Sequence, residues 1–205
     1  DIVVLQDVRF TPAEMQDVAA VVGKDLFTDE LRETLGQFEQ AKNFGSLIVP
    51  KLRDPAETLR VVEVRDFGSD LLLTEVQKRV VAVLRMAEAL APKYHVVVAN
   101  PPYLDLGNMN PTLKAFVEAN YLDTKQGLDS TFIEVAKRRA VSGGYFALIT
   151  QRSWMFLSRL EAFRSRILSS HWLADLIYLG PDVFPEINGE KVQNSAFVFN
   201  NSRPF

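Results

Sequence analysis

The sequence predicts an α/β protein in which a mainly helical segment precedes an open sheet. Apolar residues recur at helical spacing through residues 1–92. Beyond Pro92, short runs of β-branched and aromatic residues alternate with amphipathic stretches, as in α/β sheets. The last two such runs, 173–180 and 195–200, are separated by a Pro/Asn/Gly-rich stretch, which favours an antiparallel strand near the sheet edge. We expect a helical segment over 1–92 and a sheet over 93–205, together forming one compact unit.

The helical segment contains two clear helix starts. Thr11-Pro12-Ala13-Glu14 has the pattern of a capping box and begins a short helix that ends at Gly23. Thr28, followed by two acidic residues, begins a second helix that reaches about Lys42.

A third helix is predicted from Thr74, as its cap, to the residues before Pro92. Between the second and third helices, residues 43–68 are interpreted as an irregular connection with a short helix near 56–64.

The second half begins with an all-apolar run at residues 96–99, typical of a strand covered on both faces. Asn110-Pro111 caps the next helix, and Gly143-Gly144 is expected to end a helix over 130–141. The remaining predicted elements are a strand at 145–150, a helix at 158–169, and strands at 173–180 and 195–200.

Composition limits the possible partners. With 205 residues and 47% hydrophobic content, the chain can bury a core. No apolar run approaches the roughly 18–20 residues of a membrane span, and residues 1–4 do not resemble a signal peptide. The absence of cysteine excludes disulfides and thiolate metal sites, and it fits a cytoplasmic protein. A net charge of −3 implies that any contact with nucleic acid is local.

The candidate site is Asn100-Pro101-Pro102-Tyr103, directly after the strand at 96–99. Ligands of open α/β sheets bind beyond the carboxyl ends of the strands. Asn100 offers an amide oxygen as an acceptor, and the two prolines present carbonyls without a competing N–H. Tyr103 offers a flat face for stacking.

A ligand group with two N–H bonds fits these acceptors, and the exocyclic amine of adenine is one. Accepting hydrogen bonds from both N–H groups favours a more tetrahedral, more nucleophilic nitrogen. An adenine within a duplex must first be flipped out and held, for which an aromatic side chain is suited. The alternative is a turn that only ends a strand.

Asn100–Tyr103 match the [DNS]-P-P-[YFW] signature of amino-methyltransferases. The flanking stretches "KYHVVVANPPYLDLGNMNPTLKAFVEANY", "GGYFALITQRSWMFLSRLEAFRSRIL" and "LGPDVFPEINGEKVQNSAFVF" resemble the C-terminal half of the methyltransferase domain in PglX-type proteins of BREX phage-defence systems. "GKDLFTDELRETLGQFEQAKNFGSLI" is similar to their upstream helical stretch.

The resemblance implies a partial class I (Rossmann-like) methyltransferase sheet. It implies a parent enzyme that transfers methyl from S-adenosylmethionine to N6 of a flipped adenine, with DNA and other defence-system proteins as partners. Asn100, Pro101, Pro102 and Tyr103 would be the catalytic and base-holding residues, and Gly107–Asn110 a mobile loop beyond them.

Two departures from the family stand out. The family places an acidic residue before a Leu-aromatic pair, where this chain has Gly127, Leu128 and Asp129. No glycine-rich turn or strand-end acid for S-adenosylmethionine is visible, so no cofactor residue is assigned. Either the chain is a fragment that lacks the cofactor half or that half has been lost, and the isolated chain is expected to be inactive.

Other candidates have two interpretations each. Residues 137–139 and four later arginines could contact phosphates or simply face solvent, and Trp154 could stack on a base or pack in the core. His95 and His171 are interpreted as structural, and no metal constellation is expected. The four arginines are Arg152, Arg159, Arg164 and Arg166.

Two functions follow. The first is part of an adenine-specific DNA methyltransferase. The second is a non-catalytic DNA- or protein-interaction module derived from such an enzyme, which the two departures favour.

Overall fold

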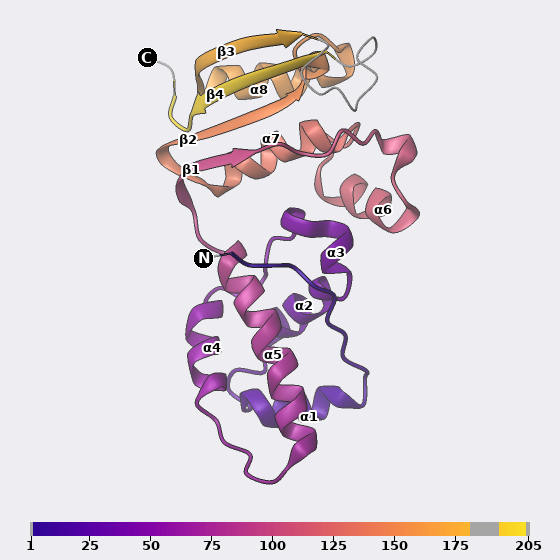
Figure 1. Ribbon diagram of the computed structural model, residues 1–205, viewed down its shortest axis with the longest axis vertical. Helices are drawn as coiled ribbons and strands as arrows, with labels where there is room; N and C mark the ends of the chain where they lie inside the picture. The colour runs from indigo at the N-terminus through magenta and orange to yellow at the C-terminus, as the bar shows by residue number, and fades with distance from the viewer. Residues whose placement is uncertain (1, 181–192, 204–205) are drawn as a thin grey trace. The chain divides into compact units, whose positions relative to one another are not determined.

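The computed structural model describes residues 2–180 and 193–203. The chain divides into two compact units, Asp1–Pro92 and Lys93–Phe205. The first unit is helical and the second contains a four-stranded sheet with helices (Figure 1). This confirms the expected α/β protein with a helical first segment.

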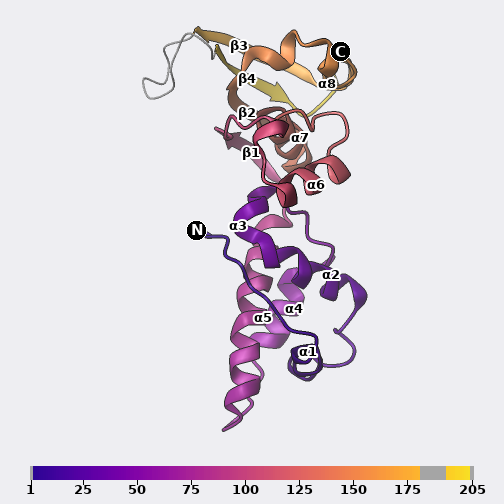
Figure 2. The same ribbon diagram turned by 90° about the vertical axis from the view of Figure 1, so that its right-hand side faces the viewer.

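The first unit is organised around its longest helix, α5 (Leu71–Leu90). Helices α1 (Glu14–Val22) and α4 (Pro55–Glu63) pack along α5 (Figure 2). The remaining elements are α2 (Asp29–Gln37), η1 (Phe38–Gln40), α3 (Ala41–Phe44) and η2 (Gly45–Leu47).

Side-chain caps fix the helix starts. Thr11 and Glu14 bond reciprocally: the Thr11 backbone N–H donates to Glu14 Oε2 at 2.8 Å and the Glu14 N–H donates to Thr11 Oγ1 at 3.3 Å. This confirms the predicted capping box. Thr28 accepts from the Leu31 N–H as predicted, and α4 matches the expected short helix.

Two predicted features of this unit are wrong. Helix α5 begins at Leu71, because Asp70 rather than Thr74 caps it by accepting from the Leu73 N–H at 3.0 Å. The second helix ends at Gln37 instead of near Lys42, since a 3₁₀ turn interrupts it before α3.

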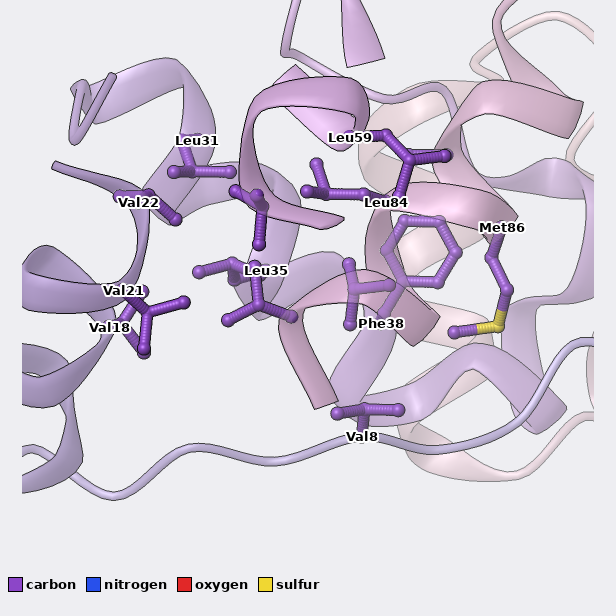
Figure 3. Close-up of a cluster of buried hydrophobic side chains, with 14 of the residues drawn as sticks. Val8, Val18, Val21, Val22, Leu31, Leu35, Phe38, Leu59, Leu84 and Met86 are labelled. Carbon is purple, nitrogen blue, oxygen red and sulfur yellow. The ribbon is translucent and has the colours of Figure 1, made fainter. Parts of the chain in front are cut away.

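A single buried cluster holds these helices together. Phe38 and Leu84 are completely buried between α5 and the shorter elements (Figure 3). The extended N-terminal segment joins the cluster through Val8, whose backbone N–H donates to the Phe38 carbonyl at 3.0 Å. The first unit therefore has its own hydrophobic core.

The second unit is a mixed sheet in the order β1-β2-β4-β3. Its strands are β1 (Tyr94–Ala99), β2 (Ala140–Gln151), β3 (Trp172–Gly180) and β4 (Asn194–Asn200). Its helices are η3 (Leu106–Asn108), α6 (Pro111–Asn120), α7 (Leu128–Arg139), η4 (Arg152–Met155), η5 (Ser158–Leu160) and α8 (Glu161–Ser170).

Strand β2 pairs parallel with β1 and antiparallel with β4, and β4 also pairs antiparallel with β3. The carboxyl ends of β1, β2 and β3 therefore meet at one edge of the sheet. The predicted antiparallel strand is confirmed, and it lies between two parallel strands.

One face of the sheet is covered and the other is open. Phe146 and Phe199 stack on the covered face, with ring centroids 5.2 Å apart, among residues of α7 and α8. On the open face, Val96 and Val98 are 60% and 73% exposed. The expectation that residues 96–99 are covered on both faces is therefore wrong for this chain.

The predicted role of Gly143-Gly144 is also wrong. Helix α7 ends at Arg139 and β2 begins at the next residue. Residues 141–144 form an irregularity in β2, since Tyr94 pairs with Ala140 but Val96 pairs with Tyr145. A side-chain carbon on Gly144 would lie 2.7 Å from the His95 carbonyl oxygen, which explains the glycine there.

The capping box makes the stability of the first unit depend on pH. Hydrogen bonds from Arg79 and Thr11 lower the pKa of Glu14 to about 2. Because the folded pKa lies below the unfolded value, the stabilisation is complete above about pH 4.5 and is lost as pH falls toward 2. We expect Glu14→Gln to lower the free energy of unfolding at pH 6, with the gap to wild type clearly narrower at pH 3 and closed only below about pH 2. Urea unfolding at both pH values measures this, and a gap that stays constant would contradict it.

Candidate functional site

Asn100-Pro101-Pro102-Tyr103 lies at the carboxyl end of β1, as predicted. Ala99, the last residue of β1, pairs with Leu148 of the parallel strand β2. Parallel strands need a long crossover connection, and here α6 and α7 provide it. The two prolines cannot donate to a ladder, so pairing ends at Ala99 and the next four residues project beyond the sheet.

The four residues differ in burial. The Asn100 side chain is exposed, and no hydrogen bond among the described residues engages it. Pro101 is buried and Pro102 exposed, which anchors one ring of the pair. Tyr103 is half-buried, and burial, together with the nearby charge of Asp129, raises its pKa.

A short β-bridge ties the segment after Tyr103 to the start of α7. Asp105 and Gly127 form the antiparallel bridge. The Leu106 N–H donates to the Gln126 carbonyl at 3.0 Å, and the Leu128 N–H donates to the Leu104 carbonyl at 2.9 Å. The position of Asn100–Tyr103 is therefore fixed from both sides, by β1 before it and by α7 after it.

The bridge brings Gly127 and Asp129 together. A side-chain carbon on Gly127 would lie 2.5 Å from Oδ1 of Asp129 and 3.7 Å from Oδ1 of Asp105. Residue 127 must therefore be glycine while Asp129 keeps this position. The Asp129 carboxyl occupies the space into which a side chain at residue 127 would project.

Asp129 is a buried acid, with 7% of its surface exposed. Burial raises its pKa, and the negative charge of Asp105 adds to the effect. A hydrogen bond from the Ser130 backbone N–H and the charge of Arg159 act in the opposite direction. Asp129 therefore takes up a proton more readily than an exposed aspartate does.

The predicted loop Gly107–Asn110 is a short turn. Gly107 and Asn108 lie in η3, Met109 is buried, and Asn110 caps α6 by accepting from the Leu113 N–H at 2.9 Å. The cap confirms the predicted start of α6, while the mobility of the loop stays a prediction.

An apolar hollow of about 200 Å³ lies beside Asn100 on the sheet. Asn100 and Asp175 are its polar members. The apolar lining comes from all four strands and includes Val98, Ile149 and Val198. The exposed amide of Asn100 thus borders a surface that has little polar character of its own.

Most of the other candidate residues have structural partners. Trp154 is 1% exposed and packs edge-on against Phe197, so it belongs to the core. Arg164 donates to the backbone carbonyls of Trp154 and Leu157. Ion pairs join Arg166 to Asp123 and Arg138 to Glu134.

The remaining candidates include two more basic residues of α7 and the two histidines, while the charge of Arg159 acts on Asp129. Burial lowers the pKa of Lys137 and of Arg139. His171 packs edge-on against Phe146 and bonds the Ser170 hydroxyl, whereas His95 is exposed on β1. In the described parts of the chain, no three acidic or histidine side chains are placed to hold a metal ion.

Arg152 differs from these residues, because it lies between two aromatic rings. Its guanidinium carbon is 5.4 Å from the ring centroid of Phe156 and 5.3 Å from that of Tyr178. Both rings are mostly exposed. The sequence analysis did not predict a role for Phe156 or Tyr178. Their only sequence signal was their position, since Phe156 lies just beyond the end of β2 and Tyr178 lies near the end of β3.

Comparison with known proteins places the chain in a family. Residues 28–184, more than half of the chain, match the family described as Eco57I restriction-modification methylase. The chain belongs to this methylase family. The matched range contains Asn100–Tyr103, the bridge to α7 and β1 to β3.

Two bacterial proteins that are similar in sequence to this chain are described as adenine-specific methyltransferases. The methylase chain is 34% identical to the adenine-specific methyltransferase PglX of Lacticaseibacillus casei over 96% of its own length. It is 34% identical to the adenine-specific methyltransferase BrxX of Escherichia coli over 84% of its length. It spans only 17% and 14% of these two relatives.

Solved structures give weaker likenesses. A type I restriction modification subunit from Vibrio vulnificus is 14% identical with a TM-score of 0.42, over 72% of this chain and 38% of that one. A class I S-adenosylmethionine-dependent methyltransferase from Listeria monocytogenes is 15% identical with a TM-score of 0.41, over 95% and 69%. No helix in residues 2–180 or 193–203 is long and apolar enough to cross a membrane.

The contact between Gly127 and Asp129 predicts a coupled pair of substitutions. Gly127→Ala should displace Asp129 and weaken the bridge by about 1–3 kcal/mol, the usual range for overpacking. The same change in an Asp129→Ala background should have a much smaller effect. Hydrogen exchange of the Leu106 and Leu128 amides reports the bridge, and equal acceleration in both backgrounds would contradict the coupling.

Proposed function

We propose that this chain is part of a DNA methyltransferase that transfers methyl from S-adenosylmethionine to N6 of a flipped adenine, as in BREX phage defence. The observation that carries the proposal is Asn100-Pro101-Pro102-Tyr103 at the end of a parallel strand, with the Asn100 amide exposed and unengaged among the described residues. Membership of a methylase family and two relatives described as adenine-specific methyltransferases support it.

The proposed role of Asn100 and Pro101 is to hold the amine. Asn100 Oδ1 and the Pro101 carbonyl would each accept one N–H of the amine, which withdraws the nitrogen lone pair from the ring. Neither Pro101 nor Pro102 has a backbone N–H, so neither offers a competing donor. Catalysis by this chain would then consist largely of positioning and exclusion of water.

The proposed role of Tyr103 is to stack on the flipped base. Its ring is half-buried, and the 104–106 segment that follows is held to α7 by two backbone hydrogen bonds. A fixed ring loses little conformational freedom when a base stacks on it, and stacking contributes about 1–3 kcal/mol per base. The base would therefore be held by its amine and by its ring.

We infer that the described residues do not supply the cofactor site. No glycine in the described residues lies in a tight turn that leads directly from a strand into a helix. Gly127 and Gly144 are instead crowded by Asp129 and the His95 carbonyl. We therefore assign no cofactor ligand in this chain and propose that the cofactor half lies elsewhere in the parent protein. The methyl donor would approach from that half.

The free edge of β1 supports this division. Among residues 2–180 and 193–203, β1 pairs on one side only, with β2, and its open face carries exposed valines. Parallel strands are normally covered on both faces and flanked by further strands. A chain that spans 17% of a related protein leaves ample sequence to supply them.

The position of Asp129 supports the proposal that this segment keeps an acidic group despite Gly127. The family's usual acid is absent at residue 127, but the Asp129 carboxyl fills the space next to Gly127. We propose that Asp129 supplies the acidic group of this segment from two positions further along the chain.

A non-catalytic interaction module is the rival function. It is favoured by the lack of a cofactor turn in the described residues and by the apolar open face of the sheet, which could receive another protein. Methylation measurements on variants of Asn100 separate the two functions.

We expect Asn100→Ala in the complete protein to reduce N6-methyladenine in cellular DNA by at least about 10²-fold, the usual effect of removing one preorganised polar group. Mass spectrometry of digested DNA measures the modification. Asn120→Ala is the matched control, since Asn120 is exposed at the end of α6 and bonds only the Phe116 carbonyl in its own helix. Methylation that survives Asn100→Ala would remove the catalytic assignment.

Cofactor binding gives a second test. Calorimetry with S-adenosylmethionine should show binding by the complete protein and none by residues 1–205 alone. The physical reason is that the described chain provides an amine-holding strand end without a cofactor turn. Tight binding by this chain alone would show that the cofactor half is not elsewhere.

A further inference from the structure

Arg152 lies at a polar hollow that the proposed chemistry does not use. The hollow has a volume of about 300 Å³ and is called here the Arg152 hollow. Its lining residues are Gln151, Arg152, Ser153, Phe156, Leu157 and Gln193. Two glutamines, a serine and an arginine supply hydrogen-bond donors, and Phe156 supplies an exposed ring.

The geometry of Arg152 is that of a preorganised cation. Its guanidinium lies over both Phe156 and Tyr178, at 5.4 and 5.3 Å from the ring centroids. Both distances are within the range of cation–π attraction. No carboxylate in the described parts of the chain pairs with Arg152, unlike Arg138 and Arg166. The rings thus restrict the guanidinium without neutralising its charge.

The hollow lies at the same sheet edge as Asn100. β2 ends at Gln151, immediately before Arg152, and β1 ends immediately before Asn100. β1 and β2 are neighbouring parallel strands, about 4.8 Å apart. Tyr178 reaches this edge from β3, where it pairs with Ser195, which in turn pairs with Thr150.

We infer that the Arg152 hollow binds a backbone phosphate of the DNA strand next to the flipped adenine. A guanidinium presents several N–H donors in a plane that matches phosphate oxygens. The chain as a whole is acidic, with a net charge of −3, so phosphate contacts must come from local cations such as this one. Phe156 and Tyr178 are positioning residues that fix the plane of the guanidinium.

This inference rests on the proposed function, because it takes DNA as the substrate. It adds a contact that holds the strand but carries no methyl chemistry. Loss of Arg152 should therefore weaken DNA binding, whereas loss of Asn100 should stop methylation while DNA still binds.

The test uses the complete protein and a fluorescein-labelled duplex oligonucleotide of mixed sequence. Arg152→Gln should raise Kd roughly ten-fold, as expected for one lost hydrogen bond to a charged group. The slope of log Kd against log salt concentration should fall by about 0.7–0.9, the contribution of one phosphate contact. Methylation at saturating DNA, measured on DNA from a strain that lacks the gene, should stay close to wild type.

Three further variants separate charge from stacking. Arg152→Lys should restore the salt slope but only part of the affinity, because lysine lacks the planar donors. Phe156→Leu or Tyr178→Leu should weaken binding and leave the salt slope unchanged. Arg166→Gln is the matched control, since Arg166 lies on α8 and pairs with Asp123.

The outcomes are distinguishable. An unchanged Kd and salt slope in Arg152→Gln, with the variant melting like wild type, would overturn the phosphate site. If Arg152→Gln unfolds, the affinity of Arg152→Lys decides: a phosphate-binding arginine predicts weaker binding than wild type, whereas a wild-type Kd in Arg152→Lys would overturn the phosphate site. Methylation that survives Asn100→Ala would overturn the proposed function instead, whatever the Arg152 variants show.

Discussion

The second unit depends on the parallel pairing of β1 with β2. Parallel pairing requires a crossover connection, and α6 and α7 supply it on the way from one strand to the next. The same pairing brings the ends of both strands to one edge of the sheet. Asn100 and Arg152, which lie 52 positions apart in the numbering, follow the ends of neighbouring strands for this reason alone.

The bridge between Asp105 and Gly127 adds a second constraint at this edge. Without it, the segment after Tyr103 would be held only by the end of β1. The bridge requires close approach of two backbones, and the buried Asp129 carboxyl leaves no room for a side chain at residue 127. The glycine at residue 127, where the family has an acid, and the acid at residue 129 therefore belong to one local arrangement.

Local signals in the sequence predicted local structure well. The capping box at Thr11 and the caps at Thr28 and Asn110 involve residues three positions apart, so their geometry is determined nearby. The start of α5 was misplaced because Asp70 and Thr74 are both good caps, and the sequence alone does not rank them.

Features that depend on distant contacts were not predictable. An apolar run at 96–99 indicates a strand, but the burial of that strand depends on neighbours that the described chain does not provide. The Gly143-Gly144 pair looked like a helix end and proved to be an irregularity against the β1 backbone. The position of Asn100–Tyr103 followed from the motif, whereas the rings around Arg152 come from separate elements that only the fold brings together.

The place of β4 in the sheet has a consequence for synthesis on the ribosome. β4 is the last of the described strands in sequence order, yet it lies between β2 and β3, which do not pair with each other. At about 5–20 residues per second, the ribosome takes seconds to reach β4 after it has completed β2. During that interval β3 has no strand partner in this unit, so the nascent sheet exposes unpaired edges until residues 194–200 emerge. The pairing of β3 with the rest of this sheet therefore waits for residues 194–200.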